Sequence, residues 1–319
     1  MPILITCGCI AIFLTFAVLI IAYICFYKTF YSPSRDKKKK KDDLSVRRVS
    51  HVLMPFRSVI GGWKAEVAKL SYKEVTITSF DGLKLVGRYY EKEKGAPVEI
   101  FFHGYRGNIE RDMDGGILRC LSRGRNALAV DHRASGRSEG RVITFGVNES
   151  RDCLSWVDFV INSIDKDAKI ILTGISMGAA TVMTAAGKED LPENVVAVLA
   201  DCGYTSPKEI IMATIKDMKL PPKILYPFVK LGGKLYGHFD IDEVSPIESV
   251  AKAKVPIIFI HGDVDDFVPH EMGVRNYEAC TSQKRFVTIE GAGHAAAFLV
   301  DPELYLSEIE GFFEPLLKN

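Results

Sequence analysis

Short, almost wholly apolar runs recur along most of this chain, and they constrain its fold more than any other feature. The segments between them have helical length and polarity, as at 149–163 and 176–187. Such runs suit strands that are buried on both faces of a parallel sheet, and strands that alternate with helices form right-handed crossover units. The runs lie at 98–102, 127–130, 169–172, 195–200, 256–260 and 285–289.

An antiparallel pair precedes these runs. Residues 74–80 and 83–90 alternate between apolar and polar side chains, and Asp81-Gly82 between them favours a two-residue hairpin turn. We therefore expect eight strands in a mostly parallel α/β sheet flanked by helices. A chain of 319 residues, 47% of them hydrophobic, is long enough to bury one large core.

The interval 204–250 interrupts this rhythm because it is too long for an ordinary crossover. Four prolines, at positions 207, 221, 222 and 227, divide it into short pieces rich in bulky apolar residues. We interpret the interval as a small helical cap over the carboxyl edge of the sheet. A lengthened surface crossover with no role in ligand binding is the alternative.

The N-terminus carries a charge-free apolar run from Ile3 to Tyr27. As a helix it is about 37 Å long, which is enough to cross a hydrocarbon core of about 30 Å with some tilt. We predict a transmembrane helix at 1–27. A cleaved signal peptide is the alternative, but it calls for a positive N-terminal region, a shorter apolar run and a small-residue cleavage site, and none is evident.

A basic neck and a lead-in helix, together residues 28–71, follow the apolar run. From Lys28 to Ser50 nine Lys/Arg face three Asp, so this segment carries +6 and the rest about −5 of the chain's net +1. The positive-inside tendency places the following domain on the cytoplasmic side, and the lysines favour an anionic lipid surface. A mildly acidic domain gives no support for nucleic-acid binding. Residues 51–70 form an amphipathic lead-in that Gly61-Gly62 is expected to break.

The strongest chemical signal is Gly174-Ile175-Ser176-Met177-Gly178, which lies between a predicted strand and an Ala-rich helical segment. A sharp strand-to-helix turn holds its central residue in a strained conformation, and the two glycines provide room. The turn presents the Ser176 hydroxyl at the edge of the sheet. It also places the Met177 N–H at a helix N-terminus, where it stabilises negative charge. We predict that Ser176 is a nucleophile.

A serine nucleophile needs a base and a group that orients the base, and both follow in the chain. His294 comes just after the last predicted strand, and Asp265 follows the penultimate one. We expect His294 to take the Ser176 proton and Asp265 to hold the imidazole. Asp263 and Asp266 are neighbouring alternatives for the acid.

These residues resemble the α/β-hydrolase superfamily, especially small bacterial esterases, serine aminopeptidase-like enzymes and monoglyceride-lipase-like enzymes. The likeness covers roughly residues 72–319, the predicted hydrolase domain. Its motifs are the serine turn, the His-Gly-x-x-Asp-x-x-Val-Pro segment at 261–269 with Asp265 in the acid position, and the Arg-rich loop 131–138, in which Ala134 replaces the usual glycine. We interpret that loop as mainly structural.

The resemblance also assigns an oxyanion loop to 103–107, after the first buried run. It implies that the Tyr105 backbone N–H is the second oxyanion donor beside Met177. Because this loop reads His-Gly-Tyr rather than His-Gly-Gly-Gly, activity on crowded tertiary-alcohol esters is less expected.

The other histidines indicate no metal site. His103 and His261 end predicted strands before glycine and are expected to make structural hydrogen bonds, and the rest have no partner at metal-ligand spacing. We expect neither a metal nor a cofactor.

The sequence therefore predicts a membrane-anchored serine hydrolase that cleaves carboxylic esters or thioesters through an acyl-enzyme. The apolar cap and the anchor favour acyl-chain or lipid-like substrates. A serine aminopeptidase-like enzyme is the first alternative, and its acidic patch for a substrate ammonium group would come from Glu209, Asp217, Asp240, Asp242 and Glu243. A membrane-tethered binding protein without turnover is the second.

Overall fold

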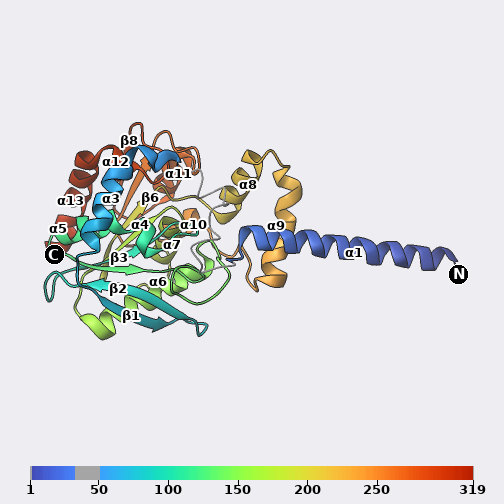
Figure 1. Ribbon diagram of the computed structural model, residues 1–319, viewed down its shortest axis with the longest axis horizontal. Coiled ribbons are helices and arrows are strands. Elements are labelled where there is room, and N and C mark those ends of the chain that lie inside the picture. The colour runs from blue at the N-terminus through green and yellow to red at the C-terminus, as the bar shows by residue number, and fades with distance from the viewer. Residues whose placement is uncertain (1, 33–50, 319) are drawn as a thin grey trace.

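One eight-stranded sheet organises the structure, a computed structural model that describes residues 2–32 and 51–318 (Figure 1). Most of the basic neck, 33–50, lies outside the described residues. The strand order is β1-β2-β4-β3-β5-β6-β7-β8. The strands are β1 (Lys73–Thr78), β2 (Lys84–Tyr90), β3 (Val98–Phe102), β4 (Asn126–Val130), β5 (Ile170–Ile175), β6 (Val195–Asp201), β7 (Ile257–Gly262) and β8 (Lys284–Ile289).

The predicted eight-stranded, mostly parallel sheet is confirmed. β1 and β2 pair antiparallel, β2 joins β4 antiparallel, and the remaining neighbours are parallel. The hairpin turn is one residue longer than we expected, because Ser79 N–H donates to Leu83 O (2.8 Å) and leaves three residues in the loop. Gly82 supplies the left-handed φ of 88° that such a loop requires.

Helices cover both faces of the sheet (Figure 1). α6 (Val147–Phe159), α7 (Met177–Ala186), α10 (Pro246–Val250) and α11 (His270–Ala279) cover one face, over a core that includes Trp156, Val182 and Val250. α3 (Arg57–Val67), α5 (Asp114–Ser122), α12 (Ala297–Val300) and α13 (Pro302–Lys318) cover the other. The short α4 (Ile109–Asp112) precedes α5.

The lead-in forms one continuous helix, α3, preceded by a 3-10 turn at Met54–Phe56. Our expectation that Gly61-Gly62 would break it was wrong. Tertiary packing overrides the low helix propensity of glycine here, because the Trp63 ring stacks on Phe298 at 5.2 Å. The opposite side of this indole fits over Gly115, where a Cβ atom would lie 2.6 Å from the ring.

The interval 204–250 does form short helices, namely α8 (Pro207–Asp217), α9 (Pro222–Tyr236) and α10. α9, beside α8, packs against the end of α1 (Pro2–Thr29), which otherwise projects from the domain as a single rod (Figure 1). Phe30 is fully buried, with its ring edge-on to Phe239 at 5.0 Å and to Phe145 at 5.9 Å. The apolar N-terminal helix is thus built into the domain at its C-terminal end.

Candidate active site

The turn between β5 and α7 places Ser176 at the carboxyl edge of the sheet. Ser176 has φ 56° and ψ −115°, a strained backbone conformation that side chains rarely adopt. Both flanking glycines are required by close backbone contacts. A Cβ atom on Gly174 would lie 2.1 Å from Gly178 O, and one on Gly178 would lie 1.9 Å from Phe102 O. The turn therefore tolerates only glycine at these two positions.

The structure brings together the three side chains that we selected from the sequence. His294 Nε2 lies 2.9 Å from Ser176 Oγ, and His294 Nδ1 lies 2.7 Å from Asp265 Oδ2. All three residues are buried. Of the neighbouring acids, Asp263 is exposed and accepts a hydrogen bond from the Gly291 N–H, and Asp266 is exposed. Only Asp265 contacts the imidazole.

The Asp265 carboxylate is held firmly in its ionised form. Its second oxygen, Oδ1, accepts backbone N–H bonds from Phe267 and Val268, both at 2.9 Å. Burial alone would raise the pKa of Asp265, but the neighbouring His294 and His261 outweigh it, so the pKa lies well below its ordinary value. An ionised Asp265 favours the tautomer in which His294 Nδ1 carries the proton and Nε2 faces the serine.

The loop after β3 lies beside the serine. Gly104 is close enough that an added Cβ would be 3.5 Å from Ser176 Cβ. His103 shapes this loop, as we expected: its Nε2 accepts the His132 N–H (3.0 Å), and its Nδ1 faces Gly104 O (2.7 Å). The Tyr105 hydroxyl donates to Thr29 O at 2.7 Å, so the end of α1 touches this loop.

The Asp131 carboxylate holds the loop 131–138 in shape and connects it to α4. It accepts the N–H group of Arg137 within the loop (2.8 Å) and that of Ile109 at the start of α4 (3.0 Å). Ala134 adopts φ 59°, a left-handed conformation that favours the glycine usual at this position. The loop is therefore a rigid piece whose backbone carries some strain.

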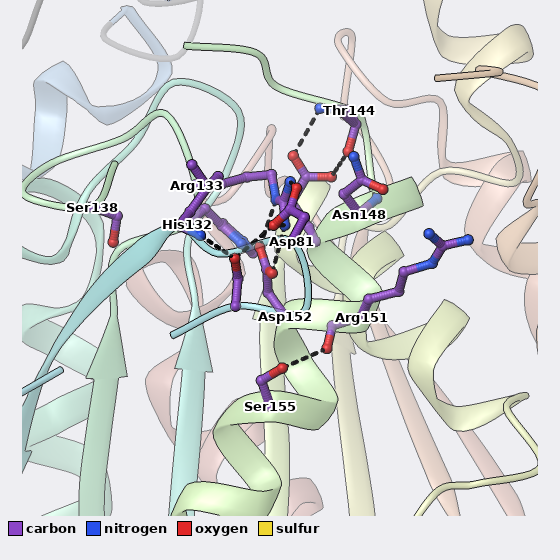
Figure 2. Close-up of polar contacts among 12 residues, drawn as sticks. Asp81, His132, Arg133, Ser138, Thr144, Asn148, Arg151, Asp152 and Ser155 are labelled. Atoms are coloured by element: carbon purple, nitrogen blue, oxygen red, sulfur yellow. Dashed lines mark hydrogen bonds and ion pairs between the residues drawn. The ribbon is translucent and has the colours of Figure 1, made fainter. Parts of the chain in front are cut away.

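Arg133 anchors the same loop to the domain (Figure 2). Its guanidinium bonds both oxygens of Asp81 (2.8 and 3.1 Å) and both oxygens of Asp152 (2.7 and 2.7 Å). The neighbouring His132 is fully buried, and burial lowers its pKa to about 4, so it is neutral at physiological pH. The contacts of Arg133 hold the loop 131–138 against the β1–β2 hairpin loop and against α6.

A cavity of about 640 Å³ opens beside Ser176 and His294. It extends between the sheet and the helices that cover the same face as α3. Its apolar lining includes Leu53, Met54, Ile60, Trp63, Met113 and Phe298. The segment 204–250, which we expected to cover the site, contributes none of the lining residues; the lead-in helix α3 takes that place.

Sequence reasoning missed three polar residues that line this cavity: Arg119, Asp201 and Tyr305. The Tyr305 hydroxyl donates to Asp201 Oδ2 at 2.9 Å, while Arg119 pairs with the buried Glu99. Burial raises the pKa of Asp201 to about 6, and its Oδ1 has no hydrogen-bond partner within the described chain. The available signal was the position of Asp201 directly after the apolar run 195–200, at the end of a predicted strand.

One group of potential metal ligands occurs among the described residues. The ligand atoms of Cys202, Asp265 and His294 lie within 4.8 Å of one another. Burial raises the pKa of the Cys202 thiol well above its ordinary value, and Asp265 and His294 already bond each other. Metals bind the thiolate form of cysteine, which burial disfavours here. The three side chains are therefore better explained by the Asp265–His294 hydrogen bond than by a metal site.

Comparison with known proteins agrees with this fold. The family model for the alpha/beta hydrolase fold matches residues 97–231. The chain is 26% identical to YqkD of Bacillus subtilis over 279 residues, 87% of this chain and 88% of that protein. It is 24% identical over 197 residues to the protein bem46 of Schizosaccharomyces pombe, which covers 61% of this chain and 60% of that protein.

Solved structures extend the likeness to three dimensions. An esterase from Pyrococcus furiosus matches with a TM-score of 0.65 and 26% identity, covering 78% of this chain and 93% of that one. The acylaminoacyl peptidase of Pyrococcus horikoshii matches with a TM-score of 0.59 and 20% identity, covering 80% of this chain and 43% of that one, which shows a common fold. The chain has the α/β-hydrolase fold, and its likeness to the esterase supports a hydrolase.

Proposed function

We propose that this protein is a serine hydrolase that cleaves carboxylic ester or thioester bonds through an acyl-enzyme. The observation that carries the proposal is the continuous chain of contacts from Asp265 through His294 to Ser176, with a serine on a strained turn at the mouth of an apolar cavity.

The proposed reaction has two halves. Ser176 Oγ attacks the carbonyl carbon while His294 Nε2 takes its proton, and a tetrahedral oxyanion forms. The Met177 and Tyr105 N–H groups stabilise this oxyanion; Met177 is the first residue of α7, so its N–H has no intrahelical acceptor. Each preorganised donor lowers the activation barrier by about 3 kcal/mol. His294 then protonates the leaving group.

In the second half, His294 removes a proton from water as the water attacks the acyl carbon. The bond from that carbon to Ser176 Oγ breaks, the serine recovers its proton, and the acid leaves. Asp265, held ionised by its histidine and backbone donors, stabilises the imidazolium in both halves.

Acyl-chain or lipid-like substrates fit the cavity best, because large apolar side chains from α3 and α12 line it. A serine aminopeptidase-like enzyme needs an excess of negative charge for the substrate ammonium group. The cavity lining has Asp112, Asp114 and Asp201 against Arg57, Lys64, Arg111 and Arg119, so it has no such excess. The acids of 204–250 that we considered for this role line no part of it.

We further propose that α1 is a retained membrane anchor with the hydrolase domain on the cytoplasmic side. By length and composition α1 is able to cross a membrane. Retention is favoured over cleavage because Ala22, Phe26 and Phe30 are buried against the domain, and their removal would uncover Phe145 and Phe239. The basic neck favours the cytoplasmic side.

Labelling with a fluorophosphonate tests the nucleophile. The wild-type chain in detergent should be labelled, and Ser176→Ala should give no labelling. Equal labelling of both proteins would contradict the proposal that Ser176 is the nucleophile. A wild type that is folded but unlabelled, and inactive on p-nitrophenyl esters, would favour the binding protein, while preference for aminoacyl amides over esters would favour the peptidase.

A matched pair of substitutions tests the acid. Asp265→Asn should lower kcat by roughly 10⁴-fold, because the imidazole loses the partner that fixes its tautomer. Asp266→Asn is the control, since this carboxylate is the next residue in the chain but is exposed, whereas Asp265 is buried. Similar losses in both variants would contradict the assignment of Asp265.

A further inference from the structure

The side of α9 that faces away from the domain carries an apolar stripe. Ile224 and Leu235 are 63% and 44% exposed, and Phe228 and Leu231 between them are half-buried. The spacing of these four residues, i, i+4, i+7 and i+11, places them along one line on the helix. The turn before α9 adds the exposed Leu220.

α9 also contacts α1 at the level where α1 leaves the domain (Figure 1). Gly232 permits the close approach, because a Cβ atom there would lie 2.4 Å from Ala22 O. The Tyr236 hydroxyl donates to Leu19 O at 3.1 Å, and its ring packs edge-on against Tyr23 at 5.2 Å. The apolar stripe therefore lies next to the point where α1 becomes free of the domain.

The apolar length of α1 up to and including this contact matches a bilayer. Residues 3–22 carry no charged side chain, and twenty helical residues span about 30 Å, the thickness of a hydrocarbon core. Tyr23 and Tyr27 follow immediately and are partly exposed, and Tyr236 joins them from α9. Tyrosines gather at membrane–water interfaces. The membrane boundary thus falls at the height of α9.

The charges around α9 fit an anionic lipid surface. Lys223 and Lys234 lie beside the stripe on α9, and Lys234 also pairs with Asp240 at 2.8 Å. Lys216 is exposed at the end of α8, and Lys219 is exposed on the turn between α8 and α9. An apolar stripe bordered by lysines is typical of helices that lie in the plane of a membrane interface. Each lysine near an anionic leaflet contributes attraction to it.

We propose that α9 is an interfacial helix, whose stripe Ile224, Phe228, Leu231 and Leu235 inserts into the lipid headgroup region beside α1. The anionic bilayer surface is the partner of this stripe. The inference rests on the proposed membrane anchoring by α1, but it is independent of the proposed ester hydrolysis.

Quenching of tryptophan fluorescence by brominated lipid tests the inference. Full-length Ile224→Trp, Leu235→Trp and Phe13→Trp variants are reconstituted into vesicles of phosphatidylcholine and phosphatidylglycerol, with and without brominated acyl chains. Phe13 lies on the exposed, free part of α1 and reports the anchor itself. Lys166→Trp, an exposed site before β5, is the control, and the wild-type signal of Trp63 and Trp156 is subtracted.

We expect both α9 variants to lose fluorescence to an extent comparable with Phe13→Trp, and Lys166→Trp to lose none. Quenching at Phe13 without quenching at 224 or 235 would overturn the interfacial role of α9. Absence of quenching at Phe13 would overturn both the anchor and the inference. Hydrolysis of a soluble p-nitrophenyl ester by the same samples reports separately on the proposed enzyme activity.

Discussion

The two N-terminal helices dock on different parts of the same domain and contribute to it differently. α3 covers the cavity beside Ser176, where its Trp63 stacks on Phe298 and fits over Gly115. α1 instead ends among α8, α9 and the loop around Phe145; it lines no part of the cavity and touches the lining residue Tyr105 through Thr29 O. Position relative to the sheet therefore decides what a segment does: the lead-in lines the cavity, and the long insertion 204–250 packs against the end of α1.

Truncation of Phe30 should have the largest effect on this comparison. Phe30→Ala removes a fully buried ring that contacts Phe145 and Phe239, which should lower the stability of the domain by about 3–5 kcal/mol. Thermal unfolding in detergent measures the change. Phe16→Ala, on the exposed part of α1, is the matched control and should leave the midpoint unchanged. Equal midpoints for both variants would mean that α1 is only a tether.

In the cavity covered by α3, the ionisation of Asp201 should make the stability of the domain depend on pH. Because burial raises its pKa from 3.8 to about 6, the native state holds this proton between about pH 4 and pH 6 while the unfolded chain releases it. Stability from this group therefore falls as the pH rises through that window, by roughly 3 kcal/mol in all.

Asp201→Asn removes this titration and keeps an acceptor for the Tyr305 hydroxyl. The variant should be more stable than the wild type near pH 7, and the two should converge below about pH 4. Unfolding measured across this pH range checks the sign. A gap that widens toward low pH would contradict the assignment.

The smallest expected effect concerns substrate length. Trp63 and Phe298 line both the main cavity and a second groove beside it, so Trp63→Ala should join the two spaces. The ratio of kcat/KM for long-chain over short-chain p-nitrophenyl esters should rise by up to about tenfold. Trp63→Phe, which keeps an aromatic ring against Phe298, should change the ratio less. An unchanged ratio in Trp63→Ala would mean that α3 takes no part in binding the substrate chain.

The sheet was predictable because strands buried on both faces appear in the sequence as continuous apolar runs. The serine turn was predictable because a Cβ atom on either of its glycines would lie about 2 Å from backbone atoms, so the turn requires glycine at both positions. The cavity walls were not predictable, because they depend on α3 crossing residues that are remote in the chain, such as Gly115 and Phe298. Asp201 was missed because nothing in its local sequence distinguishes it from a strand-end acid. Gly61-Gly62 misled because helix propensity is weaker than packing.

The contact between α1 and α9 sets an order of events during synthesis. Leu19 and Tyr236, which share a hydrogen bond, are 217 positions apart in the chain. α1 therefore leaves the ribosome more than two hundred residues before its partner on α9. In the proposed topology α1 is by then in the bilayer, so its contact with α9 should form at the membrane surface.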